Sequence, residues 1–299
     1  MRRLSLVLAL TLVLSGCSTG YVISAGDLDD GTIPKKSVLV SELVPTPTDA
    51  QKSAKVAILA HGYSASTYEM QALEDYLEGK GYLVSNVLLG GHGTSVADFE
   101  KTTWKDWGRP VAAEYQKLRD MGFQDVSVVG ASTGGTLFLE MLASQQLKPA
   151  PKRVVLVGTL VNFKEKAIAF SGLLGWFGAK SSPNNLGQNA VGNWYRNRPI
   201  GTLQSLVDLT EIVKGQLRSG ISLDTGTKAL IIQSDGDPTV DSESAKLILS
   251  GLKGDASLRM IHSKLHVPIR LPDVDRNWTD QEKAQQQDLL AEIDRFIAN

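Results

Sequence analysis

The sequence predicts an α/β fold in which helices cover both faces of a mostly parallel central sheet. Apolar runs of strand length alternate with helical patterns along most of the 299 residues. One interval, at about 163–222, breaks this alternation and indicates an inserted helical cap. With 42% hydrophobic and 21% charged residues, the chain is long and apolar enough for one large globular domain with a sizeable core.

Six apolar runs have the length and character of buried strands. In chain order they are Lys55–Ala60, Tyr82–Leu89, Asp125–Gly130, Arg153–Val161, Lys228–Gln233 and Ser257–His262. Apolar residues at helical spacing mark two of the intervening or following segments: Trp107, Val111, Tyr115 and Leu118, and then Leu290, Ile293 and Ile297. The alternation predicts parallel strands joined by helical crossovers.

Between residues 161 and 228 we find no convincing strand. An apolar, glycine-studded stretch at 167–179 precedes an Asn-rich loop, and Leu203–Leu217 has a helical pattern. We interpret this interval as a cap over the C-terminal edge of the sheet. Its aromatic residues either fasten the cap to the sheet or line a substrate-binding acyl pocket, for which the candidates are Phe170, Trp176 and Phe177.

The first residues are predicted to be an export signal and not part of the fold. Met1-Arg2-Arg3 is a short cationic start, and the apolar run at 4–13 is too short to span a bilayer. Leu14-Ser15-Gly16-Cys17 resembles the lipobox of bacterial lipoproteins. The resemblance implies a signal peptide at 1–16, cleavage before Cys17 and acylation of that cysteine.

The lipidated Cys17 is then expected to anchor the protein to a membrane of the bacterial cell envelope through acyl chains such as palmitate. Cys17 is the only cysteine, so an internal disulfide is excluded. A tether at 17–36 leads into a domain at 37–299. By resemblance to enterobacterial sorting, Ser18 in place of Asp implies the outer membrane, facing the periplasm or the exterior.

The stretch VSVVGASTGGTLFLEML at 126–142 runs from a strand pattern through a turn of small residues into a helical pattern. Its centre matches G-x-S-x-G, with Ser132 as the serine, and this context is that of a nucleophile elbow. The glycines would let strand and helix pack closely while Ser132 is exposed at the edge of the sheet. The N–H of Thr133 would lie at a helix N-terminus and stabilise an oxyanion. An ordinary strand-to-helix turn is the alternative.

A serine nucleophile needs a base, and in this class of fold the order along the chain is serine, acid, histidine. Of the four histidines, only His262 and His266 follow Ser132. His262 closes a strand and is expected to point into the sheet packing. His266 lies in the loop beyond, at the sheet edge where ligands bind, so we predict it as the base.

Three carboxylates in ALIIQSDGDPTVD compete for the role of the acid: Asp235, Asp237 and Asp241. Asp237 lies between a glycine and a proline in a rigid loop, and we predict it as the acid, with Asp235 in reserve. Turn formation alone would also explain Asp237. The second oxyanion donor should come from the loop after the first strand, where the N–H of Tyr63 can face the serine and His61 can hold the loop.

Together, the motifs HGY, LLGGHGTS, GASTGG, IIQSDGDPTV and HSKLHVPIR resemble the α/β-hydrolase superfamily, especially bacterial carboxylesterases, monoacylglycerol lipases and lysophospholipases. The resemblance covers about residues 55–299 and implies the α/β-hydrolase fold. It implies these roles: Ser132 as nucleophile, Asp237 as acid, His266 as base, and Tyr63 and Thr133 as backbone oxyanion donors. It also implies a structural role for His92.

We therefore predict a serine esterase that hydrolyses carboxylic esters of short to medium acyl chains through an acyl-enzyme, acting on a small-molecule or lipid ester. An amidase or peptidase, an acyltransferase and a non-catalytic envelope lipoprotein with this fold remain alternatives. We expect no cofactor, because no strand leads into G-x-G-x-x-G, and no metal, because His262 and His266 lack the Glu of H-E-x-x-H. A net charge of −1 without a Lys/Arg block argues against nucleic acid as a partner.

Replacing Cys17 with alanine tests the anchor. The Cys17→Ala protein should carry no acyl chain and should no longer sediment with membranes. Metabolic labelling with a palmitate analogue measures this directly, and a wild-type chain that takes up no label would contradict lipidation.

Overall fold

The computed structural model describes residues 36–164, 181–183, 190, 192–272, 274 and 276–299. In this part of the chain six strands form the central sheet: β1 (Lys55–Ala60), β2 (Leu83–Val87), β3 (Asp125–Ala131), β4 (Arg153–Val157), β8 (Lys228–Ser234) and β10 (Asp255–Ile261). Their order across the sheet is β10-β8-β4-β3-β1-β2, and each neighbouring pair is parallel. The predicted α/β-hydrolase fold class is confirmed.

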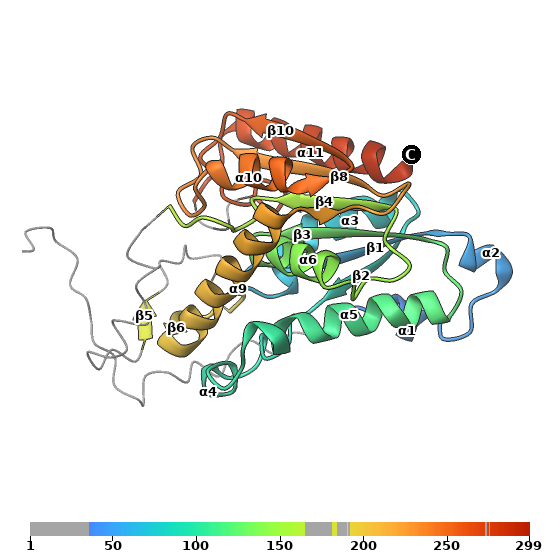
Figure 1. Cartoon of the computed structure of the whole chain (residues 1–299), viewed down its shortest axis with the longest axis horizontal. Coiled ribbons are helices and arrows are strands. Elements are labelled where there is room, and N and C mark those ends of the chain that lie inside the picture. The colour runs from blue at the N-terminus through green and yellow to red at the C-terminus, as the bar shows by residue number, and fades with distance from the viewer. Residues whose placement is uncertain (1–35, 165–180, 184–189, 191, 273, 275) are drawn as a thin grey trace, which may run out of the picture.

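Helices cover both faces of this sheet (Figure 1). One face packs against α1 (Val40–Leu43), α4 (Val96–Phe99), α5 (Trp104–Asp120), α6 (Thr133–Ala143), α9 (Ile200–Ser219) and α10 (Glu243–Gly251). The other face packs against η2 (Thr67–Met70), α3 (Gln71–Gly79) and α11 (Asp280–Ala298), whereas α2 (Asp49–Lys52) contributes no buried residue.

The alternation of side chains along each strand explains why both faces are apolar. In β1, Val56 and Ile58 belong to the core under α5 and α6, whereas Ala57 and Leu59 belong to the core under α3 and α11. A strand buried on both sides is apolar at nearly every position, which is what the almost continuous apolar runs in the sequence indicate.

The interval between β4 and β8 contains short strands that the sequence did not reveal. β5 (Ser181–Pro183) pairs antiparallel with β6 (Asn197–Pro199), and β7 (Ile221–Ser222) pairs with β9 (Leu252–Lys253). The expectation that this interval contains no strand is therefore wrong. Two or three residues are too few for a two-residue hydrophobic period to be detected. The helical segment expected at 203–217 is present as α9.

The strand order places a crevice at the ends of β1 and β3. β2 lies on one side of β1, and β3, the next strand along the chain, lies on the other side. The strand order therefore reverses its direction between β1 and β3. Ligands of open α/β sheets bind at such a switch point, beyond the carboxyl ends of the strands. Ala60 pairs with Gly130, so the residues that follow the two strands emerge side by side.

Several predicted features fall outside the described residues. These are the signal peptide at 1–16, Cys17, nearly all of the tether, and the cap residues Phe170, Trp176 and Phe177. Across the ranges that the structure does describe, we found no helix that combines the length and the hydropathy needed to cross a membrane.

Candidate active site

A cavity of about 350 Å³ opens at the switch point of the sheet. Its lining includes four site residues that were predicted from the sequence, Tyr63, Ser132, Thr133 and His266, and also Gly62, which precedes Tyr63. They come from the loops after β1, β3 and β10. The fold therefore brings together side chains and backbone groups that lie up to about 200 positions apart in the sequence.

Ser132 lies at a sharp turn between β3 and α6. Its backbone has φ 49° and ψ −117°, a conformation that costs a non-glycine residue about 1–3 kcal/mol. A Cβ atom at Gly130 would lie 2.5 Å from the nitrogen of Gly135, and one at Gly134 would lie 2.2 Å from the carbonyl oxygen of Ala60. Only glycine fits at these two positions, so strand and helix meet closely and the turn is the expected elbow.

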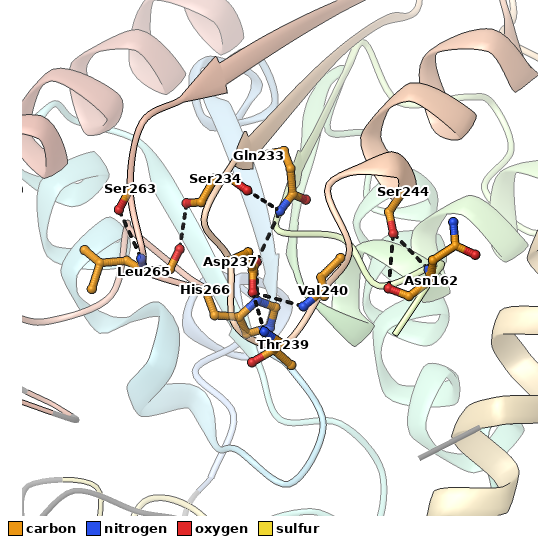
Figure 2. A network of polar contacts seen from close by, with 10 residues as sticks. All are labelled: Asn162, Gln233, Ser234, Asp237, Thr239, Val240, Ser244, Ser263, Leu265 and His266. Atoms are coloured by element: carbon orange, nitrogen blue, oxygen red, sulfur yellow. Dashed lines mark hydrogen bonds and ion pairs between the residues drawn. The ribbon is translucent and has the colours of Figure 1, made fainter. Parts of the chain in front are cut away.

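His266 is joined to Asp237 at the side of the cavity (Figure 2). Its Nδ1 lies 2.8 Å from Oδ2 of Asp237, whose side chain is fully buried. A carboxylate accepts hydrogen bonds, so Nδ1 carries the proton and Nε2 is left with a lone pair. This tautomer gives His266 the form that a general base requires.

The Asp237 carboxylate is fixed by further donors. Oδ1 accepts the backbone N–H groups of Thr239, at 2.7 Å, and Val240, at 3.0 Å, and the amide of Gln233 approaches Oδ2 at 3.2 Å (Figure 2). Burial would raise the pKa of Asp237, but the charge and hydrogen bond of His266 and the two N–H groups more than offset it and hold the pKa below its ordinary value. Asp237 is therefore ionised and oriented toward His266.

The reserve candidate Asp235 belongs to a different pair. Its Oδ2 lies 2.8 Å from Nδ1 of His262, and both side chains are on the surface, at 47% and 96% exposure. The expectation that His262 points into the sheet is wrong, because β10 is the edge strand and His262 follows its last residue. The third candidate, Asp241, accepts the N–H of Glu243 at the start of α10.

Hydrogen bonds to the carbonyl oxygen of Gly62 set the direction of the Tyr63 N–H in the loop after β1. The carbonyl oxygen of Gly62 lies 2.8 Å from Nδ1 of His61 and 3.3 Å from the N–H of Ala65. A trans peptide directs its C=O and N–H to opposite sides, so the N–H of Tyr63 points the other way. Tyr63 and Thr133 both line the cavity beside Ser132, and Thr133 is the first residue of α6, whose N–H has no acceptor within the helix.

His61 has the structural role that we expected. Its Nε2 accepts the N–H of Leu89 at 3.1 Å, which leaves the ring proton on Nδ1 to bind Gly62. Burial lowers the pKa of His61 to about 4, although the bond to Gly62 acts in the opposite direction. His61 is therefore neutral at physiological pH and keeps one tautomer.

His92 holds this loop through Ser64, and Tyr63 joins it to α9. Nε2 of His92 accepts the N–H of Ser64 at 3.3 Å, and burial lowers its pKa well below the ordinary value. The hydroxyl of Tyr63 lies 2.6 Å from Oγ1 of Thr202 in α9. The role of His92 in the structure is thus to hold the loop, as the resemblance implies.

Two buried charged residues of the cavity were not predicted from the sequence. Glu69 and Arg270 line the same space as Ser132, and each is less than a tenth exposed. Glu69 lies in a short helical turn and Arg270 beyond the last strand, so no local pattern sets them apart from surface residues. Among the described residues, no group of three or more His, Cys, Asp and Glu side chains is placed to hold a metal ion.

The sequence is similar to those of several known enzymes. Residues 51–195 match the family model described as Serine aminopeptidase, S33. A carboxylesterase of Bacillus subtilis (strain 168) is 23% identical over 219 residues, which are 71% of this chain and 84% of that protein. A thermostable monoacylglycerol lipase of Bacillus sp. (strain H-257) is 26% identical over 228 residues, 74% and 86% of the two chains.

Solved structures of lipolytic enzymes have the same fold. A structure from the work on LipS and LipT, two metagenome-derived lipolytic enzymes, superposes with a TM-score of 0.65 at 21% identity, covering 81% of this chain and 94% of that one. A soluble variant of monoglyceride lipase from Saccharomyces cerevisiae gives 0.63 at 12% identity, covering 84% and 88%. These likenesses in sequence and fold indicate an α/β-hydrolase. The chain is a hydrolase of the esterase and lipase kind.

The two Asp–His pairs allow a matched test of the acid. Asp237→Asn should favour the wrong tautomer of His266 and lower kcat by about 10⁴-fold. Asp235→Asn removes the exposed partner of His262 and should leave kcat close to the wild-type value. Steady-state hydrolysis of p-nitrophenyl butyrate measures both, with thermal unfolding as the folding control, and the opposite ranking would move the role to Asp235.

Proposed function

We propose that this chain is a serine carboxylic-ester hydrolase that works through an acyl-enzyme. The observation that carries the proposal is the hydrogen-bonded Asp237–His266 pair, whose histidine lines the same cavity as Ser132 at its strained turn. A nucleophile, an oriented base and backbone donors in one cavity are the parts that acyl transfer needs.

In the proposed mechanism, Oγ of Ser132 attacks the ester carbonyl carbon while Nε2 of His266 takes the hydroxyl proton. The carbonyl oxygen becomes an oxyanion that accepts the N–H groups of Tyr63 and Thr133. Asp237 stabilises the imidazolium. The C–O bond of the ester then breaks, and His266 returns the proton to the departing alcohol. A water molecule, activated by His266 in the same way, releases the acid and restores Ser132.

The sequence relatives support an ester substrate. The two Bacillus proteins are a carboxylesterase and a monoacylglycerol lipase, and each is covered over more than four-fifths of its length. The family description, Serine aminopeptidase, favours amide hydrolysis as the second candidate, because the same nucleophile and base can cleave a peptide bond. Acyl transfer to an alcohol would use the same acyl-enzyme.

For the acyl group we propose short to medium chains. The described walls of the cavity include the apolar side chains of Leu160, Phe163, Leu203 and Leu206. Apolar walls bind acyl chains through buried area, and a cavity of about 350 Å³ lies at the lower end of the range for small-molecule sites. We further propose that the enzyme acts while anchored in the bacterial cell envelope through lipidated Cys17.

Ester and amide substrates with the same acyl group separate the first two candidates. The wild type should hydrolyse p-nitrophenyl butyrate much faster than the corresponding anilide. Ser132→Ala should lower kcat by about 10⁶-fold with folding unchanged, because the nucleophile is lost. A Ser132→Ala protein that kept about a tenth of the wild-type rate, far above this expectation, would show that another group attacks the ester.

A series of p-nitrophenyl esters tests the acyl pocket. From acetate to about hexanoate or octanoate, kcat/KM should rise by roughly fourfold for each buried methylene, since each contributes about 0.8 kcal/mol, and should then level off or fall. Phe163→Ala should flatten this rise more than it slows acetate hydrolysis. Phe296→Ala, in α11 and packed against the core on the other face of the sheet, is the matched control and should leave the chain-length profile unchanged. Acetate as the best substrate would contradict the pocket.

A further inference from the structure

Glu69 is a buried carboxylate whose function the proposed mechanism leaves open. It lies in η2, the short turn that follows the loop after β1, and its exposed fraction is 4%. Oε2 accepts the backbone N–H of Gly62 at 2.5 Å. A carboxyl group is expensive to bury without a hydrogen-bond partner, and this one directs its oxygen at the backbone next to the oxyanion donor.

Hydrogen bonds hold both backbone polar groups of Gly62, its N–H and its C=O. On one side of Gly62 the N–H is bound by Glu69, and on the other side the carbonyl oxygen is bound by His61 and Ala65. Both peptide planes at Gly62 are therefore fixed. Since the second of these planes contains the N–H of Tyr63, the direction of that donor depends on both sets of bonds.

Gly62 is closely surrounded by Glu69 and Ser132. A Cβ atom at Gly62 would lie 3.0 Å from Oε2 of Glu69 and 3.1 Å from Cβ of Ser132. Both the Glu69 carboxylate and the serine thus lie against Gly62. Loss of the carboxylate would remove one of the two groups that hold Gly62 in place beside Ser132.

Glu69 is itself supported from the sheet. The side-chain amide of Asn86, in β2, donates to the carbonyl oxygen of Thr67 at 2.9 Å, and the N–H of Glu69 donates to the carbonyl oxygen of Ser66 at 3.0 Å. Hydrogen bonds therefore fasten η2 to β2, an edge strand of the sheet, and η2 in turn holds Glu69 against Gly62. Such support is what holds an active-site group within the tolerance that catalysis needs.

Glu69 can accept the N–H of Gly62 in either protonation state. Burial raises the pKa of Glu69, while the N–H of Gly62 and the charges of Arg270 and His266 act in the opposite direction. Either state of the carboxyl group offers an oxygen lone pair to Gly62. The hydrogen bond, and not the net charge, is thus the feature common to both states.

We propose that Glu69 is a positioning residue that fixes the N–H of Tyr63 toward the oxyanion by binding the Gly62 peptide. This inference rests on the proposed serine-hydrolase function. Glu69 should therefore stabilise the transition state and leave substrate binding in the ground state unchanged, because the oxyanion forms only after Ser132 attacks.

Two substitutions at Glu69 test the inference. Glu69→Leu removes the acceptor and should lower kcat for p-nitrophenyl butyrate by about 10²-fold, the effect of losing one oxyanion donor, with KM little changed. Glu69→Gln keeps an acceptor oxygen and should retain most of kcat. An alkyl trifluoromethyl ketone forms a hemiketal oxyanion when Ser132 adds to its carbonyl, so its inhibition constant should rise in Glu69→Leu by a factor similar to the loss of kcat.

Glu114 supplies the matched control. It is also buried, at 3% exposure, and also accepts a backbone N–H, that of Ser41 at 3.1 Å, but it lies in α5 away from the cavity. Glu114→Leu should lower the melting temperature and leave kcat unchanged. If Glu69→Leu does not fold, Glu69→Asp replaces it, because its shorter side chain withdraws the carboxylate and should lower kcat below that of Glu69→Gln.

Each contrary result is distinct. Wild-type kcat in Glu69→Leu, or in Glu69→Asp where that variant replaces it, would overturn the inference. An equal loss in Glu69→Gln and Glu69→Leu would show that charge matters and not the hydrogen bond. A raised KM at constant kcat would make Glu69 a substrate-binding group. A wild-type protein without turnover on any ester would instead overturn the proposed function, and the inference with it.

Discussion

The close approach of α6 to the end of β1 is the constraint on which the site depends. Gly134 lies so near the carbonyl groups of Ala60 and His61 that a Cβ atom there would overlap both, at 2.2 and 2.8 Å. This contact brings the elbow after β3 against the loop after β1, and the pairing of Ala60 with Gly130 sets their relative height. These two features bring Ser132 and the proposed oxyanion donors into the same cavity.

Backbone groups near the serine are oriented by buried polar side chains, each with a defined partner. His61 and His92 are neutral because burial disfavours their charged forms, so their ring nitrogens can accept hydrogen bonds from the backbone. Asp237 is ionised because several donors surround it. The same fold thus keeps two histidines uncharged and holds one carboxylate charged beside a third histidine, and these differences in environment separate supporting groups from reacting ones.

The sequence predicted the features that depend on local patterns. Buried parallel strands are apolar at nearly every position, so β1 was predicted with its bounds Lys55–Ala60 and β4 (Arg153–Val157) lies within the predicted run Arg153–Val161. The elbow has its own spacing around Ser132. Features that depend on tertiary position could not be predicted. His262 is exposed because its strand lies at the sheet edge, and Glu69 is buried because the loop after β1 folds over it. Neither fact leaves a periodic signal in the sequence.

Intact-mass analysis after treatment with a fluorophosphonate tests the central claim most directly, because only an activated nucleophile beside an oxyanion site displaces the fluoride at a useful rate. The account predicts a single adduct, mapped by peptide sequencing to Ser132, with none in a protein that carries alanine at this position. A wild-type chain that remains unlabelled, or an adduct on any other residue, would contradict the assignment of Ser132 as the nucleophile.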